Sequence, residues 1–171
     1  MFIRKAFENH EPVIPDTAYV ANSAEIVGSV VIGEYCSIWS NAVIRADINS
    51  IAIGEMVNVQ ECCIIHVETE RGTIVGNGVT IGHGAILHAC TIEDFSMIGI
   101  GAIVLDGVSI GNHCIVAAGS VVPPGKTIPP RSMVMGTPGK IVRTLSDDEA
   151  LGLENHAKRY RDLAKRHKGG K

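Results

Sequence analysis

The chain has 171 residues, 46% of them hydrophobic, so it is long enough to bury one core and too short for two ordinary domains. Its formal net charge of -3 gives no basic surface of the kind that binds nucleic acid or an anionic membrane. No segment has the apolar length of a membrane span or a secretory signal, so we expect a cytoplasmic protein without membrane or nucleic-acid partners.

A six-residue repeat of branched aliphatic residues runs from residue 14 to residue 134, with two long steps, after Ile44 and Ile65, and one short step after Leu87. It occupies Ile14, Val20, Ile26, Ile32, Ile38, Ile44, Ile53, Val59, Ile65, Val75, Ile81, Leu87, Ile92, Ile98, Val104, Ile110, Val116, Val122, Ile128 and Val134. Six is not a helical period, and β-branched residues with frequent glycines are typical of short strands joined by tight turns. Three such hexads make one triangular coil, and coils stack about 4.8 Å apart. The repeat predicts an all-β solenoid, a parallel β-helix, over residues 1–140 with a short lead-in.

An α-helix is predicted after the solenoid. Five prolines between residues 122 and 140 end the β-helix, because proline cannot donate to a central ladder. Ser146 and Glu149 then form a capping-box signature. One apolar stripe follows: Leu153, Ala157, Tyr160 and Ala164. We expect residues 141–171 to be a linker, this helix and a short tail from Gly169, packed on the solenoid as one structural unit.

Five cysteines occur without any C-x-x-C spacing, which argues against a disulfide framework and against a four-thiolate metal site. The repeat places Cys36, Cys63 and Cys114 at a position that small residues otherwise occupy. We therefore expect reduced thiols that act as compact hydrophobic side chains.

Two histidines are predicted to lie side by side. Counting hexads stacks three core residues at one corner of successive coils, and the residues that directly follow them are Arg45, His66 and His88. His66 and His88 should project from adjacent coils at the spacing that two nitrogens on one metal require. His83 belongs to another side of the triangle and cannot reach this pair within its own chain. In a three-fold assembly it can reach the pair of the next subunit, so we predict a homotrimer with metal ligands His66, His83 and His88.

Three imidazoles leave a fourth position for water, which is the arrangement of a catalytic zinc site rather than a structural one. Zinc would lower the pKa of that water to about 7. Imidazole suits ferrous iron equally well, so the sequence does not choose the metal. The remaining histidines, His10, His113, His156 and His167, are expected to be solvated surface residues.

Four further polar residues lie close to the histidines in the repeat. Gln60 is one hexad ahead of His66, where it could orient a metal-bound water, and Asn58 could hold Gln60. Arg45 and Asp47 share one side of a strand under the two-residue alternation. Either they form an ion pair across a subunit boundary, or Arg45 also attracts an anion.

Together these spacings resemble the γ-class carbonic anhydrases. The resemblance rests on R-x-D at Arg45 and Asp47, N-x-Q at Asn58 and Gln60, and the H-x4-H segment that ends at His88. It implies a left-handed β-helix, a homotrimer, and reversible hydration of CO2 to bicarbonate with zinc, iron or cobalt. It also implies that Arg45 and Asp47 stabilise the trimer, and that Tyr160 either reaches the pocket or merely packs the helix.

The chain departs from that family's pattern in two places. Ile48 stands where the archetype has a glutamate, and the loop Val67–Thr73 is short, with only Glu68 and Glu70 as acidic residues. Both positions serve proton export in the archetype. Two alternatives therefore stay open, a hexapeptide-repeat acyltransferase and a noncatalytic metal-binding assembly subunit.

Overall fold

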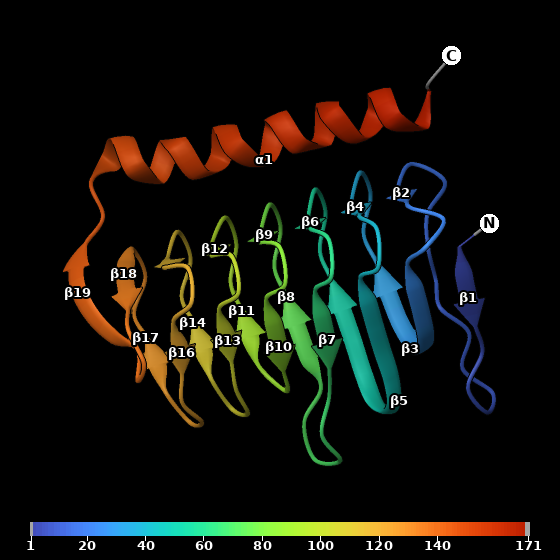
Figure 1. Ribbon diagram of the computed structural model, residues 1–171, viewed down its shortest axis with the longest axis horizontal. Helices are drawn as coiled ribbons and strands as arrows, with labels where there is room; N and C mark the ends of the chain where they lie inside the picture. The colour runs from blue at the N-terminus through green and yellow to red at the C-terminus, as the bar shows by residue number, and fades with distance from the viewer. Residues whose placement is uncertain (1, 170–171) are drawn as a thin grey trace.

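The computed structural model describes residues 2–169 as a parallel β-helix with one long helix, α1 (Asp147–Lys168), lying along its side (Figure 1). The strands are β1 (Ile3–Lys5), β2 (Tyr19–Val20), β3 (Glu25–Ile32), β4 (Ser37–Ile38), β5 (Val43–Ile53), β6 (Asn58–Val59), β7 (Ile64–His66), β8 (Thr73–Val75), β9 (Thr80–Ile81), β10 (Ile86–His88), β11 (Thr91–Ile92), β12 (Met97–Ile98), β13 (Ile103–Val104), β14 (Ser109–Ile110), β15 (Ile115–Val116), β16 (Val121–Val122), β17 (Thr127–Ile128), β18 (Ser132–Met135) and β19 (Lys140–Thr144). The predicted solenoid and C-terminal helix are both confirmed.

The coils form a prism with three faces. The first face carries β7, β10, β13, β16 and the N-terminal halves of β3 and β5. The second face carries β8, β11, β14, β17 and the C-terminal halves of β3 and β5. The third face carries β2, β4, β6, β9, β12, β15 and β18. The repeat slips at the corner between the first two faces, because Ile44 and Ile53 lie on the two halves of β5, and Ile65 and Val75 lie on β7 and β8.

The predicted repeat residues fill the interior. From Ile26 to Val134 every one of them is buried, whereas Ile14 and Val20 are partly buried at the N-terminal end. The expected column of Ile44, Ile65 and Leu87 is confirmed by the ladders, which pair these residues in register. These stacked aliphatic side chains fill the interior of the prism, and the residues that alternate with them along each strand face the surface.

The solenoid ends one strand later than the prolines suggest. Residues from 141 on, predicted as a linker, form most of β19, which pairs antiparallel with β18. β18 is the last strand of the third face's parallel ladder, so its free edge would expose unpaired backbone groups. The returning strand covers that edge.

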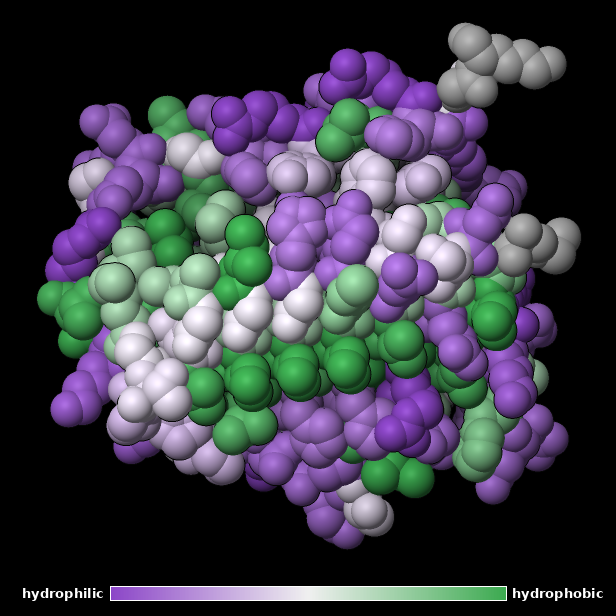
Figure 2. Space-filling view, viewed as in Figure 1, coloured by the Kyte–Doolittle hydropathy of each residue, from purple (hydrophilic) through white to green (hydrophobic). Residues whose placement is uncertain are grey.

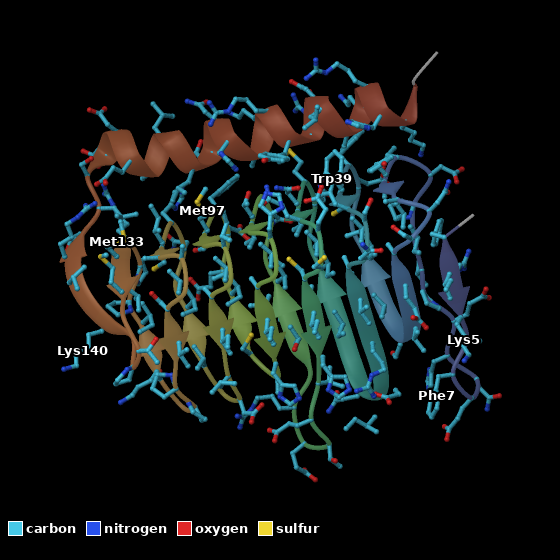
Figure 3. All side chains as sticks on the ribbon, viewed as in Figure 1. Lys5, Phe7, Trp39, Met97, Met133 and Lys140 are labelled. Atoms are coloured by element: carbon cyan, nitrogen blue, oxygen red, sulfur yellow. The ribbon has the colours of Figure 1, made fainter. Side chains whose placement is uncertain are left out.

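Helix α1 lies over the third face and contacts β2, β4 and β6. The predicted capping box is present at its start, since the Ser146 side chain accepts from the Glu149 backbone and Glu149 accepts from the Ser146 backbone. Leu153, Ala157 and Ala164 are buried against the coils. Trp39 and Met97 lie between the helix and the prism (Figure 3). Among residues 2–169, no helix is long and apolar enough to cross a membrane.

All five cysteines are unpaired, as expected. Cys36 and Cys63 are fully buried in the core. Burial raises the pKa of the Cys36 thiol to about 12 and that of Cys63 to about 11, so neither is reactive near neutral pH.

Candidate metal centre

His66 and His88 end neighbouring strands of the first face. β7 and β10 pair in register, so His66 lies directly beside His88, as the repeat predicts. The Nδ1 atom of His66 lies 3.1 Å from the Nε2 atom of His88. Two nitrogens on one tetrahedral ion are separated by a little over 3 Å. The pair therefore has the spacing of a half-site for a metal.

The outer nitrogen of each ring faces a carboxylate. Nε2 of His66 lies 3.1 Å from Asp47, and Nδ1 of His88 contacts Asp106. An ionised carboxylate only accepts hydrogen bonds, so these outer nitrogens carry the ring protons. In the neutral rings, both inner nitrogens are then lone-pair acceptors facing each other without a proton to share. A cation beside the pair would satisfy both lone pairs, so the donor set fits a metal.

Asp47 is held ionised beside this pair. Partial burial opposes its ionisation, but hydrogen bonds from His66, its own backbone N–H and Arg45 together hold the pKa of this carboxyl below its ordinary value. Arg45 forms its ion pair with Asp47 of the same chain. Asp47 therefore links the arginine to the histidine pair.

His83 lies at a different corner, between the third and first faces, just after β9. Gly84 follows it with a φ of +67°, a left-handed conformation that suits glycine at this turn. Nδ1 of His83 lies 2.6 Å from Glu61, and half of the side chain is exposed. Its Nε2 atom thus carries the free lone pair.

The two corners are separated by the width of the first face. Within residues 2–169, no three side chains of one subunit come together in a way that could hold a metal. The first face between the corners carries an outward row of aliphatic residues, Val43, Ile64, Ile86, Ile103 and Val121. Figure 2 shows a continuous hydrophobic band across the molecule, with mostly hydrophilic side chains below it and residues of intermediate hydropathy directly above much of it. His83 therefore does not join His66 and His88 within one chain.

Gln60 is fixed on two sides. Its Oε1 atom accepts from the His83 backbone N–H at 3.1 Å, and its Nε2 atom donates to the Tyr160 hydroxyl at 2.7 Å. The prediction that Asn58 holds Gln60 is wrong. The Asn58 oxygen accepts instead from Ser37 and Trp39, one coil toward the N-terminus, and within residues 2–169 its amide nitrogen has no partner. The two amides point to opposite neighbours along the prism.

A hollow of about 290 Å³ lies beside His83 between α1 and the coils. Trp39, Tyr160 and Leu163 give it an apolar wall, whereas Gln60 and His83 give it a polar side. Tyr160 therefore reaches the region of the candidate site as well as packing the helix.

We predict that Tyr160→Phe lowers the free energy of unfolding by about 1–3 kcal/mol, because the buried Gln60 amide loses its acceptor. Urea unfolding monitored by circular dichroism measures the change. Tyr35→Phe, on an exposed turn residue, is the matched control. Equal stability of the two variants would show that the hydrogen bond contributes nothing.

Glu61 and Asp106 were not identified from the sequence. A signal exists, because Asp106 lies one coil after His88 and Glu61 lies one coil before His83. A carboxylate one coil from each predicted ligand is a pattern that hexad counting can find.

The chain matches the family model described as "Bacterial transferase hexapeptide (six repeats)" over residues 89–124. It is similar to a solved structure described as a putative acetyltransferase from Bacillus cereus, with 36% identity and a TM-score of 0.96. That match covers 99% of this chain and 98% of the other. The fold is therefore shared with proteins that carry transferase descriptions.

Similar sequences carry a more specific description. "Gamma carbonic anhydrase 2, mitochondrial" of Arabidopsis thaliana is 39% identical over 91% of this chain, which spans only 58% of that relative's length. "Probable carbonic anhydrase" of Methanocaldococcus jannaschii is 44% identical over 89% of this chain and 96% of its own. Sequence identity at this level, over nearly the whole length of a relative, includes many residues outside the aliphatic repeat. The chain belongs to the γ-class carbonic anhydrase family of hexapeptide-repeat proteins.

Proposed function

We propose that the chain is a homotrimeric γ-class carbonic anhydrase, which converts CO2 and water reversibly to bicarbonate and a proton at metal sites between subunits. The observation that carries the proposal is the pair of inner ring nitrogens of His66 and His88, which lie 3.1 Å apart. Relatives described as carbonic anhydrases support the same reaction.

His66 and His88 of one subunit and His83 of the partner subunit would hold the metal. Each ring offers the nitrogen that its carboxylate leaves free. Zinc is the first candidate, with iron or cobalt as alternatives that imidazole also accepts. Bound zinc supplies the Lewis acidity that brings the pKa of a coordinated water to about 7.

The chain's other residues position and shield this site. Gln60 and Tyr160 fix the backbone that carries His83, through two hydrogen bonds beneath α1. Hydrogen bonds from His66, the Asp47 backbone and Arg45 keep Asp47 ionised, and Asp47 in turn orients His66. Because Arg45 is half exposed beside the histidine pair, it also favours an anionic product such as bicarbonate. Glu68 and Glu70, on the loop after His66, are the acidic candidates for proton export.

The first face supports a three-fold assembly. Its aliphatic row, shown as a band in Figure 2, would be buried if each subunit turned this face toward a three-fold axis. That arrangement brings the His66 corner of one subunit against the His83 corner of the next. The same rotation thus completes the metal sites.

We expect Ile64→Arg to convert the trimer to monomers, because Ile64 is 44% exposed within this row and arginine would be buried there without a partner. Ile74→Arg is the matched control, since Ile74 is 54% exposed on the second face. Light scattering after size-exclusion chromatography gives the mass of each. A trimeric Ile64→Arg variant would place the interface elsewhere.

Stopped-flow CO2 hydration by the anaerobically purified, metal-loaded protein tests the activity. We expect hydration that disappears on removal of the metal. Metal binding without hydration would instead identify a noncatalytic assembly subunit. The similarity to a structure described as an acetyltransferase makes acetyl-CoA the second probe, and acetyl-CoA binding without metal would favour the acyltransferase alternative.

We also propose a cytoplasmic location. The five unpaired cysteines support it, since reduced thiols persist in a reducing compartment. Localisation of the tagged protein by fluorescence microscopy tests this assignment.

A further inference from the structure

We infer that Glu61 and Asp106 are positioning residues that fix the ring orientation and the tautomer of His83 and His88. Each places the ring proton on Nδ1 and so leaves Nε2 for the metal, whereas Asp47 leaves Nδ1 of His66. The inference rests on the proposed function, because it takes these histidines as the ligands. It specifies which nitrogen of each ring binds the metal and which carboxylates determine that nitrogen.

Asp106 is well placed for this role. It lies in the turn after β13, one coil beyond His88, and its carboxylate contacts Nδ1 of that ring. Its backbone is held from both sides along the prism, because Gly107 donates to Ala89 and Gly125 donates to the Asp106 carbonyl, each at 2.8 Å. The carboxylate therefore starts from a fixed backbone position.

Glu61 has the equivalent position for His83 at the other corner. It lies one coil before His83, and its Oε2 atom is 2.6 Å from Nδ1. Gly84 donates to the Glu61 carbonyl at 2.9 Å, which locks the two turns together. Within residues 2–169, the Glu61 carboxylate makes no other ion pair. An exposed ring such as His83 would otherwise rotate freely and bind metal less tightly.

The three carboxylates, of Asp47, Glu61 and Asp106, act on the three histidine rings in the same way. Each ring donates one N–H to a carboxylate and keeps one lone pair, so the three rings together offer three acceptors and no competing donor. With either carboxylate removed, the ring can take the other tautomer, and its proton then points at the metal position. The ring would then have to return to its original tautomer before it could bind the metal.

The test compares matched variants of the metal-free full-length protein. Zinc affinity is measured by competition with a chelator, and ¹⁵N NMR of labelled histidine reports which ring nitrogen carries the proton. We expect Glu61→Ala and Asp106→Ala to bind zinc about 10–100-fold more weakly, and to lose the Nδ1–H tautomer of the affected ring. Glu61→Gln and Asp106→Asn keep an acceptor and should recover much of the affinity. Glu55→Ala, on an exposed turn of the same coil as Glu61, should behave as wild type.

Wild-type zinc affinity and wild-type tautomers in both alanine variants would overturn the inference. Zinc binding by the unaltered protein would still support the proposed metal site in that case. If the unaltered protein binds no zinc, the proposed function fails, and the tautomers alone decide the role of the carboxylates. Circular dichroism of the amide variants shows that the fold is kept.

Discussion

His88→Ala should abolish zinc binding and CO2 hydration together while the folded trimer persists. The variant removes one of the two facing nitrogens, so the half-site of one subunit is lost. Two remaining imidazoles do not hold zinc as three do. Because His88 is one-third exposed at the surface, its removal leaves no cavity in the core. We expect metal content to fall from about one ion per subunit to a trace, and hydration to fall to the uncatalysed rate.

Elemental analysis, stopped-flow hydration and light scattering on one sample measure the three quantities. His113→Ala is the control, because His113 contacts Glu154 and stacks near Phe95, away from both corners. Full metal content in His88→Ala would remove His88 from the ligand set.

Leu87→Ala should have the largest effect on stability. Leu87 is fully buried and pairs in register with Ile65 and Val104, so truncation opens a cavity within the central stack. Buried leucine to alanine changes cost about 2–5 kcal/mol. Urea unfolding should show this loss in the free energy of unfolding at constant protein concentration.

Thr127→Ala on the exposed surface of the second face is the control, and we expect a change within about 0.5 kcal/mol. A loss of similar size in both variants would contradict the view that the aliphatic column holds the solenoid together.

The interior of the fold follows from the sequence because a solenoid repeats one local rule. Ile44, Ile65 and Leu87 were predicted to stack, and the ladders pair them. The side-by-side position of His66 and His88 follows directly, since each comes one residue after a stacked core residue. Periodicity therefore predicts the position of a side chain along the prism.

Periodicity does not predict what a side chain bonds to. Asn58 and Gln60 lie two residues apart on one surface, yet they bond in opposite directions along the prism. His113 was expected to be solvated, but α1 covers it and brings Glu154 to its ring. Such contacts depend on side-chain direction and on the path of the helix, which the repeat leaves undetermined.

The antiparallel strand β19 was missed for a similar reason. Its residues, Lys140–Thr144, are exposed and carry no hexad signal. Their conformation comes from the free edge of β18, which is a property of the assembled solenoid rather than of the segment.

Mixed trimers test the central claim, that one site takes ligands from two chains. Equal amounts of His83→Ala and His88→Ala chains are unfolded, refolded together and separated by distinct tags, so that only mixed trimers are analysed. A site is restored where a chain with intact His66 and His88 lies against a chain with intact His83. Cyclic symmetry allows about one such interface in each mixed trimer. We predict about one zinc ion per mixed trimer and none in either parent. Mixed trimers as empty as their parents would contradict the shared site.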